Sequence, residues 1–329
     1  MPTIDLKQEP RVSVIIPAYN TAGLIATCLD SVFGQTFRDF EAVVVNDGSP
    51  DTVQLEQVLE PYLGKIVYVR QENKRAAGAR NTAIRKARGE FLAFLDSDDS
   101  WLPNHLQNQM ELFEQDSSLD LVYSDALLVS HTQPDASFMD RCPSNGLPSF
   151  EALVVERCQI PIATVVARKT SIVKAGMFDE TLKRCDDYDM WLRTAFYGAK
   201  IGYRRDLQAR CYAGGRPGCL GESAAKMAEA FWKILEKAAQ TLPLNEAQRE
   251  LVLRQAKEAQ ARYLLEEGKL HLGAREPEKA RELFAEANRL SRNLKVSVAI
   301  RSLQVAPRFA GSLLAAWKRL RMEGVTGQG

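Results

Sequence analysis

Residues 12–49 read VSVIIPAYNTAGLIATCLDSVFGQTFRDFEAVVVNDGS, and this stretch decides the fold class. Residues 12–16 form a β-branched run that Pro17 is expected to stop, and residues 40–45 form a second run before an Asp-Gly turn. The apolar residues of 23–33 recur with helical spacing between the two runs. The sequence therefore predicts a strand, a helix and a second strand, which is the repeating unit of a parallel α/β sheet.

The same alternation continues to residue 95. Helices are predicted over 55–63 and 76–88, and strands over 65–70 and 91–95. In open sheets of this kind, ligands bind outside the carboxyl ends of the strands. Because the polar clusters of this chain follow those ends, we expect the functional site there.

Beyond residue 221 the sequence becomes helical and rich in Ala, Glu, Lys and Arg. Residues 261–293 have the apolar spacing of one tetratricopeptide-type helical hairpin. Repeat folds need several copies to bury a core, so two helices packed on the preceding domain remain the alternative. We therefore predict an α/β domain over 1–221, a helical extension over 222–293 and a C-terminal segment over 294–329.

The composition is that of a soluble globular protein. The 329 residues are 45% hydrophobic and 26% charged, and the net charge of +1 indicates no nucleic-acid partner. The sequence contains no run of 18 apolar residues, so it predicts no membrane span. The first 20 residues lack the pattern of a secretion signal. The six cysteines have no CxxC spacing, which argues against a zinc site or a disulfide framework and favours a reducing cytoplasm.

Residues 96–99 read Asp-Ser-Asp-Asp directly after an apolar strand. Their three carboxylates repel one another, and no Lys or Arg lies nearby in the sequence. Asp96, Asp98 and Asp99 are therefore candidate ligands for Mn²⁺ or Mg²⁺, which prefer oxygen ligands and can bridge a protein to a diphosphate. The alternative is that Asp98 or Asp99 caps the helix that follows.

Two neighbouring strand ends carry candidate nucleotide-binding residues. Asp47 can accept a hydrogen bond from the N3–H of uracil, and Gly48 lets the backbone approach a ligand closely. Residues 17–20, Pro-Ala-Tyr-Asn, offer an aromatic face and an amide to a base or a ribose. The alternatives are an ordinary Asp-Gly turn and a simple strand-to-helix connection.

Charged residues mark the starts of two further helices. Arg75 and Arg80 flank small residues, so an anionic diphosphate can approach the helix N-terminus and an arginine fork can hold it. A solvated basic helix face is the alternative. Residues 185–193, CDDYDMWLR, place three acids at a helix start, where capping explains only one. A carboxylate positioned over an acceptor hydroxyl would serve as a general base.

Taken in order, five motifs within residues 11–221 resemble glycosyltransferase family 2. They are VSVIIPAYN, VVNDGSPD, ENKRAAGARNTAI, GEFLAFLDSDDSW and GMFDETLKRCDDYDMWLR. The resemblance implies a GT-A fold, which is a Rossmann-like, mainly parallel catalytic domain, here with a C-terminal α-helical extension. It also implies an inverting, metal-dependent hexosyl transfer from a nucleotide-sugar, UDP-linked by preference, to a glycan or lipid-linked acceptor in cell-envelope or exopolysaccharide synthesis.

The resemblance also implies residue roles. Asp187 matches the catalytic base, and Asp186 stands where Glu is usual. Asp47 matches the uracil-binding acid, residues 96–98 match the DxD metal motif, and one of the two arginines faces the diphosphate. The expected donor-binding set is Pro17, Ala18, Tyr19, Asn20, Asp47, Arg75, Gly78, Arg80, Asn81, Asp96, Ser97 and Asp98. The residues expected on the acceptor or phosphate side are Asp186, Trp191 and Arg216.

Two departures from the family refine this expectation. The chain lacks the Gln-x-x-Arg-Trp segment of processive members, which favours a single sugar addition. Arg216-Pro217-Gly218-Cys219 stands where many members carry a His, so Arg216 is expected to face phosphate instead.

Two other classes of function stay open. One is a non-catalytic nucleotide-sugar-binding module whose helical tail recruits partners. The other is a nucleotidyltransferase, which is disfavoured because no Gly-rich basic loop follows the first strand.

The C-terminal segment is basic and amphipathic. Residues 292–322 hold seven Lys and Arg residues and no acid, and Phe309, Leu313, Trp317 and Leu320 share one helical face. Such a helix suits the cytoplasmic surface of an anionic membrane, as a peripheral contact. The alternative is that it packs on the preceding hairpin.

Overall fold

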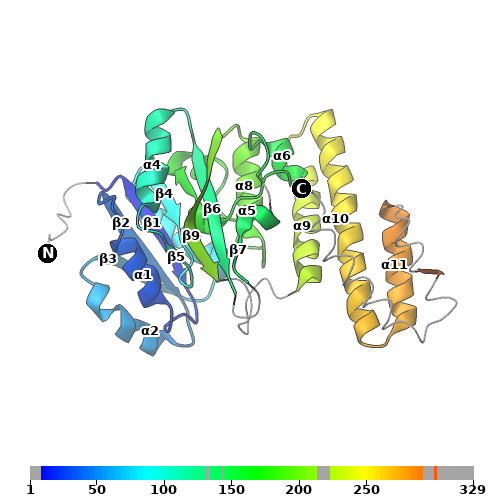
Figure 1. Cartoon of the computed structure of the whole chain (residues 1–329), viewed down its shortest axis with the longest axis horizontal. Helices are drawn as coiled ribbons and strands as arrows, with labels where there is room; N and C mark the ends of the chain where they lie inside the picture. Colours follow the sequence, from blue (N-terminus) through cyan, green and yellow to red (C-terminus); the bar gives the residue numbers. More distant parts are fainter. Residues whose placement is uncertain (1–8, 131–133, 143, 213–222, 292–299, 302–329) are drawn as a thin grey trace. The chain divides into compact units, whose positions relative to one another are not determined.

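The computed structural model describes residues 9–130, 134–142, 144–212, 223–291 and 300–301. The chain divides into two compact units, Met1–Cys219 and Leu220–Gly329, whose elements are labelled in Figure 1. The sequence prediction placed this boundary after residue 221. Apart from residues 300–301, the expected C-terminal segment over 294–329 lies outside the described residues.

The described part of the first unit builds one nine-stranded sheet, in the order β3-β2-β1-β4-β8-β6-β9-β5 with β7 beside β6. Its strands are β1 (Val12–Ala18), β2 (Phe40–Asp47), β3 (Ile66–Gln71), β4 (Phe91–Phe94), β5 (Ser100–Trp101), β6 (Leu121–Val129), β7 (Ala136–Ser137), β8 (Val166–Arg168) and β9 (Ile201–Tyr212). Only β5, β7 and β8 run against the others. The predicted mainly parallel α/β sheet is therefore confirmed.

Helices cover both faces of this sheet. They are α1 (Ile25–Phe33), α2 (Thr52–Leu59), α3 (Arg75–Lys86), α4 (His105–Gln115), α5 (Phe138–Arg141), α6 (Phe150–Val154), α7 (Lys169–Lys174) and α8 (Asp186–Phe196), with 3₁₀ turns η1 (Glu60–Tyr62) and η2 (Ile162–Thr164). The apolar residues of α1, α2 and α4 join one core cluster with Val12, Val14 and Ile16 of β1. On the other face, Phe94 of β4 packs edge-on against Trp191 of α8. The sheet is thus the middle layer of three.

Two strands extend further than the sequence predicted. The ladder between β1 and β4 ends at Ile15, whereas the ladder between β1 and β2 continues to Ala18. Pro17 has no N–H to donate, so a strand tolerates it where only one neighbour is paired. In the same way, β2 continues to Asp47 because β3 still pairs that residue with Gln71. The carboxylate of Asp47 is therefore held by a strand and not by a loose turn.

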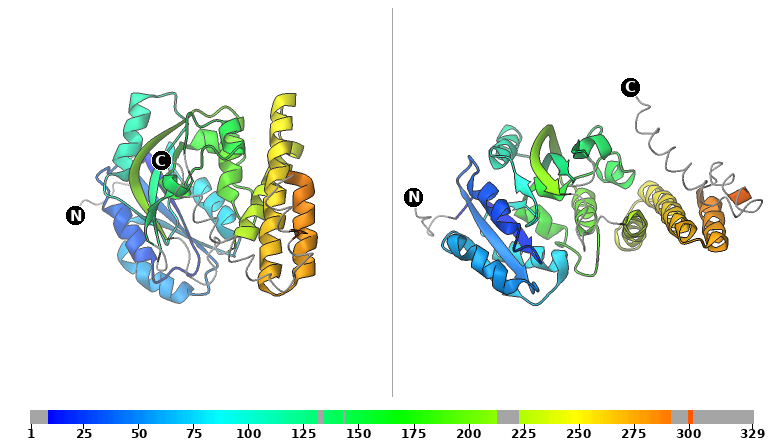
Figure 2. Two further views of the ribbon diagram at one scale, coloured as in Figure 1. Left: turned by 45° about the vertical axis from the view of Figure 1, so that its right-hand side comes forward. Right: turned by 60° about the horizontal axis from the view of Figure 1, so that its bottom comes forward.

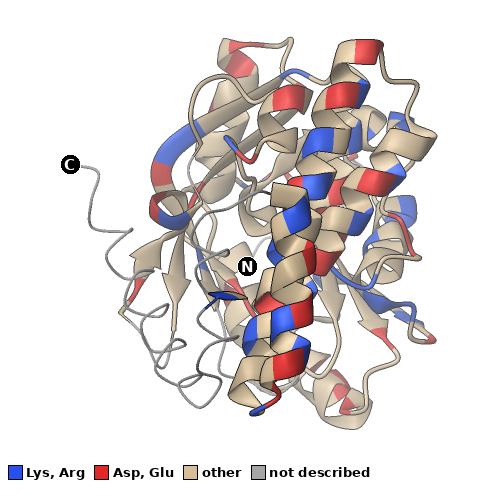
Figure 3. Cartoon of the chain, turned by 90° about the vertical axis from the view of Figure 1, so that its right-hand side faces the viewer, with Lys and Arg blue, Asp and Glu red and all other residues tan. Residues whose placement is uncertain are grey.

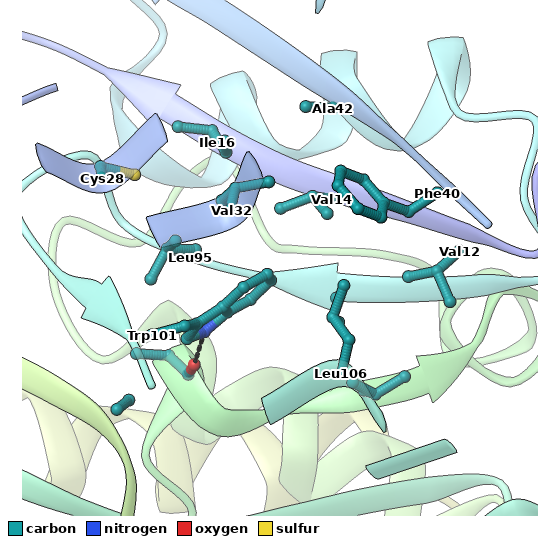
Figure 4. Packing of buried hydrophobic residues seen from close by; sticks show 14 of the residues in the cluster. Val12, Val14, Ile16, Cys28, Val32, Phe40, Ala42, Leu95, Trp101 and Leu106 are labelled. Atoms are coloured by element: carbon teal, nitrogen blue, oxygen red, sulfur yellow. Dashed lines mark hydrogen bonds between the residues drawn. The ribbon is translucent and has the colours of Figure 1, made fainter. Parts of the chain in front are cut away.

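Trp101 anchors the chain directly after the acid cluster. Figure 4 shows its indole ring beside Leu95 and Leu106 in the core, beneath β1. Its Nε1–H donates to the backbone oxygen of Ala163 at 2.6 Å. Because a buried indole N–H needs an acceptor, this bond fixes the ring and therefore the end of the loop that carries the acids.

The second unit contains three long helices in its described part, α9 (Ala224–Thr241), α10 (Glu246–Gly273) and α11 (Pro277–Ser291). Figure 2 shows α10 and α11 side by side. The ring of fully buried Phe284 fills the space above Gly268, where a Cβ atom would come within 2.3 Å of it. Ala280 is buried beside Phe284, and Ile300 packs on the same cluster. Close packing of a large ring against small residues thus stabilises this hairpin.

The outer surfaces of these helices mix both signs of charge, as Figure 3 shows. Ion pairs join residues three apart, Glu266 with Lys269 and Glu278 with Arg281. Such pairs each contribute a few tenths of a kcal/mol, about 0.2–0.5. Across the described ranges, no helix is both long and apolar enough to span a bilayer.

Candidate functional site

Loops from three strands meet at the carboxyl edge of the sheet. The backbone N–H of Asn20, after β1, donates to the hydroxyl of Ser49, after β2, at 2.6 Å. The hydroxyl of Thr21 bonds the hydroxyl of Ser97, after β4, at 2.9 Å. The segments 17–20, 46–49 and 96–99, which the sequence singled out separately, are therefore brought together.

Asp47 is the last residue of β2, at this edge of the sheet, and is only 2% exposed. Its Oδ1 accepts hydrogen bonds from Nε2 of Gln71 at 2.6 Å and from the backbone N–H of Lys74 at 2.8 Å. Burial raises the pKa of Asp47 above its usual value, and these hydrogen bonds partly offset that rise. A hydrogen bond from the backbone of Arg75 also acts on this carboxylate, so the side chain of Asp47 is fixed at the end of β2.

The surroundings of Asp47 suit a planar ligand. Tyr19, at the end of the adjacent strand, is 52% exposed, so its ring offers an open face. Gly48 has φ +64°, and a Cβ atom there would come within 2.8 Å of the backbone nitrogen of Asn73. Only glycine fits this close approach, which draws the 72–75 loop over the end of β2.

The acid cluster after β4 concentrates negative charge in a partly buried loop. Burial, followed by the charges of Asp98 and Asp96, raises the pKa of Asp99 well above its usual value. The same three carboxylates add to burial in raising the pKa of the Cys28 thiol. Asp99 also accepts the backbone N–H of Tyr212 at 3.0 Å, which ties the loop to the end of β9.

This donor set fits a divalent cation. Carboxylate oxygens are the ligands that Mg²⁺ and Mn²⁺ prefer. The pKa of Asp99 is raised first by burial and then by the charges of Asp98 and Asp96, and a cation would relieve that second, electrostatic part. Over the described ranges, no group of three His, Cys, Asp or Glu side chains is already arranged around one metal position. Asp96, Asp98 and Asp99 therefore stay the predicted ligands of a metal ion.

Arg80 of α3 lies beside the acid loop, which the sequence pattern did not predict. Its Nη2 lies 2.6 Å from Oδ1 of Asp96, and its Nη1 lies 2.7 Å from Oδ2 of Asp186. The guanidinium also lies over the ring of Phe178, 5.5 Å from the centroid. Asp96 is 16 residues and Asp186 is 106 residues away along the chain, so no local pattern could have revealed the pair.

Arg75, the other candidate arginine, has a different environment. It is exposed at the first position of α3, with a positive φ of 62°. The structure thus separates two residues that the sequence treated alike, one buried between carboxylates and one facing solvent.

Gly78 and Asn81 hold a loop in place, although the sequence predicted them at the donor. The Asn81 amide donates to the Phe178 carbonyl at 2.8 Å and to Glu180 at 2.9 Å, and it accepts from the Phe178 N–H. A Cβ atom on Gly78 would come within 2.4 Å of the Lys74 side chain. Asn81 therefore ties α3 to the loop at Phe178, and Gly78 leaves room for the side chain of Lys74 at the start of the same helix.

Asp187 lies in the first turn of α8, beyond Cys185, whose left-handed backbone starts the helix. Burial, then the adjacent charge of Asp186, raises the pKa of Asp187 to about 6, while the Arg80 cation opposes that rise. A carboxylate with such a pKa is suited to accept a proton near neutral pH. Its neighbour Asp186 is joined through Arg80 to Asp96, so Asp187 directly follows a residue that is linked to the acid cluster.

Trp191 corrects the sequence prediction. Expected on the acceptor or phosphate side, it is 1% exposed and packs edge-on against Phe94 and Phe178 in the core. Its ring therefore supports α8 from beneath and cannot touch an acceptor. Arg216, the other such residue, lies outside the described residues.

Comparison with known proteins identifies relatives of the first unit. Residues 13–126 match the family model described as Glycosyl transferase family 2. An uncharacterized glycosyltransferase of Rickettsia typhi is 32% identical, and the alignment covers 56% of this chain and 58% of that protein. The chain thus spans little more than half the length of that relative.

Two further relatives have names that state an activity. The amylovoran biosynthesis glycosyltransferase AmsB of Erwinia amylovora is 34% identical, covering 57% of this chain and 65% of AmsB. The Escherichia coli WfgD, a UDP-Glc:alpha-D-GlcNAc-diphosphoundecaprenol beta-1,3-glucosyltransferase, is 32% identical, covering 55% of this chain and 68% of WfgD.

Solved structures share the fold. S. aureus TarS 1-349 in complex with UDP-GlcNAc aligns with a TM-score of 0.59 at 18% identity, covering 97% of this chain and 92% of that one. The mannosyltransferase PcManGT from Pyrobaculum calidifontis, in complex with GDP-Man and Mn²⁺, aligns with a TM-score of 0.59 at 20% identity, covering 94% and 85%. At these identities the likeness shows the GT-A fold.

Proposed function

Since this chain belongs to glycosyltransferase family 2, we propose that it transfers a sugar from a nucleotide-sugar to an acceptor hydroxyl with inversion. The observation that carries the proposal is the continuous link Asp96–Arg80–Asp186. This link sets the acid cluster of the donor side beside Asp187, a carboxylate whose pKa is suited to a base. Transfer requires both groups at one site.

The donor is proposed to be a UDP-sugar. A carboxylate oxygen of Asp47 would accept the N3–H of uracil while the ring stacks on Tyr19. The fold relatives TarS and PcManGT are named with UDP-GlcNAc and GDP-Man. Uracil is favoured here because one acceptor oxygen matches its single ring N–H.

Asp96 and Asp98 would hold Mn²⁺ or Mg²⁺. When bound, such an ion supplies positive charge that stabilises the departing nucleoside diphosphate. Nη2 of Arg80 donates to Oδ1 of Asp96 at 2.6 Å, which fixes this carboxylate. Removal of the proton from the acceptor is assigned to a side chain of the protein.

Asp187 is proposed to take the proton from the acceptor hydroxyl. The oxygen then attacks the anomeric carbon from the face opposite the diphosphate, and this single displacement inverts the configuration. Positioning of acceptor and donor in one site contributes much of the acceleration. The acceptor is proposed to be a glycan or a lipid-linked saccharide. WfgD is named with alpha-D-GlcNAc-diphosphoundecaprenol, and AmsB is named for amylovoran biosynthesis.

The pH dependence of turnover should follow Asp187. Its carboxyl group works as a base only when ionised, and its pKa is raised to about 6. We therefore expect kcat to be constant above about pH 7 and to fall roughly tenfold per pH unit below pH 6. Initial rates between pH 5 and 8.5 would show this limb, with each sample returned to pH 7.5 to prove that the loss is reversible. A kcat that stays flat down to pH 5 would exclude Asp187 as the base.

The basic C-terminal segment is proposed to contact an anionic membrane surface. We expect the full chain to co-sediment with phosphatidylglycerol-containing vesicles at low salt and to be released by about 0.5 M salt, because the Debye length then shortens to a few Å. Truncation after Arg301 is the matched variant, since it keeps Ile300 on its cluster. If the full chain stays in the supernatant, the membrane proposal is wrong, and the alternative that the segment packs on the hairpin is favoured.

A donor panel tests the proposed function. UDP-, GDP-, dTDP-, CDP- and ADP-sugars would be offered with Mn²⁺, and both binding and release of the free nucleotide would be measured. Binding and release with a UDP-sugar supports the proposal. Binding without release identifies a non-catalytic nucleotide-sugar-binding module, and pyrophosphate formation from UTP and a sugar phosphate identifies a nucleotidyltransferase.

A further inference from the structure

Arg80 joins the two halves of the site through a cluster that we call the Arg80 cluster (Arg80, Asp96 and Asp186). The two arms of the guanidinium reach two different elements, the loop after β4 and the first residue of α8, at 2.6 and 2.7 Å. The Arg80 side chain is only 6% exposed. A planar fork that bonds two carboxylates in a buried place fixes their mutual position more strictly than a flexible ammonium can.

Asp187 is the residue after Asp186, and the charges of the Arg80 cluster shift its pKa. Burial and the neighbouring Asp186 carboxylate favour the protonated form of Asp187, and the Arg80 cation favours the ionised form. The pKa of Asp187 therefore depends on whether Arg80 stays between the acids. A residue that does not touch a substrate can in this way set the state of the base.

Charged groups on the other elements packed against α8 are engaged elsewhere. Glu151 of α6 is exposed to solvent. On α7, Lys169 and Lys174 each donate to a backbone carbonyl. The charges with the largest effect on the pKa of Asp187 are those of Asp186, Arg80 and Asp96, the members of the Arg80 cluster.

We propose that Arg80 is a positioning residue: its fork holds Asp96 and Asp186 in one arrangement and so sets the surroundings of Asp187, the next residue of α8. This assignment rests on the proposed function of Asp187 as a base. Two N–H groups of the fork bond carboxylates of the protein, so this role is distinct from the expected contact of Arg80 with the donor diphosphate.

Arg80→Met tests the proposal, since it removes the charge and keeps a long side chain. The probe is the ¹³C signal of the Asp187 carboxyl in aspartate-labelled protein, identified by its absence from Asp187→Asn. We expect the pKa of Asp187 to rise by about one pH unit or more in Arg80→Met, the scale for loss of a nearby opposite charge. An unchanged pKa would overturn the proposal.

Arg193→Met is the matched control. Arg193 is comparably buried, with a side chain 12% exposed, and it pairs with Asp189 of the same helix at 2.6 Å. Its loss should weaken the fold without moving the titration of Asp187. An equal pKa rise in both variants would mean that any damage to α8 has this effect, and the specific role of Arg80 would fall.

Arg80→Lys covers the case in which Arg80→Met does not fold. The ammonium keeps the charge but loses the planar fork that bonds both carboxylates. We expect a smaller rise in the pKa of Asp187 and a drop in kcat of about tenfold. Wild-type values for both would overturn the proposal. The titration needs no turnover, so absence of sugar transfer by the wild type would remove the proposed function and leave this result standing.

Discussion

Asp187→Asn should lower kcat by about 10²-fold or more, the range attributed to a general base. The amide has nearly the same shape as the carboxylate but cannot accept the acceptor proton. Affinity for the UDP-sugar and for Mn²⁺ should stay close to wild type, because the main proposed donor contacts lie at strand ends and not in α8. Steady-state kinetics and calorimetric binding on the same preparation would separate the two effects.

Asp179→Asn provides the matched control for this variant. Asp179 lies in the loop that leads to α8, and its Oδ1 accepts from the backbone and hydroxyl of Thr181, a role that an asparagine oxygen can also fill. Its turnover should therefore match that of the wild type. If donor affinity collapses in Asp187→Asn, the residue binds or supports structure, and the base must be sought elsewhere.

Asp98→Asn should remove the response of turnover to added metal. Charge stabilisation by a bound metal amounts to several kcal/mol, so its loss should cost about 10²- to 10³-fold in rate. The amide keeps the shape of the loop but lacks the charge that holds a cation. Rates would be measured across a Mn²⁺ titration, beside UDP affinity in the absence of metal.

Two further observations sharpen that test. UDP affinity without metal should change little, because Asp47 and Tyr19 are proposed to hold the base. Asp98→Glu keeps the charge at a greater reach, so it should retain part of the metal response. Wild-type activity and metal dependence in Asp98→Asn would exclude Asp98 as a ligand.

Local patterns predicted the first half of the sheet and part of the site. Strand and helix periods are set by neighbouring residues, so the alternation up to residue 95 could be read directly. The antiparallel strands β5, β7 and β8 were not predicted because they are only two or three residues long. Such short strands exist through pairing with distant partners and carry little pattern of their own.

The site could be predicted only where its chemistry is contiguous. Asp47 and Asp98 belong to short motifs, whereas the role of Arg80 depends on a partner 106 residues away. Trp191 was misplaced for a related reason. It lies one turn after Asp187, which suggests a shared face, but α8 is buried on nearly all sides, so spacing alone does not say which side meets the core.

Release of free UDP from a UDP-sugar, with Mn²⁺ and then with excess EDTA, tests the central claim most directly. We predict that the wild-type chain releases UDP in the presence of the metal, that EDTA abolishes the release, and that Asp187→Asn releases UDP at most at about a hundredth of the wild-type rate. Binding of the donor without any UDP release, under every metal condition and with every sugar offered, would contradict the account.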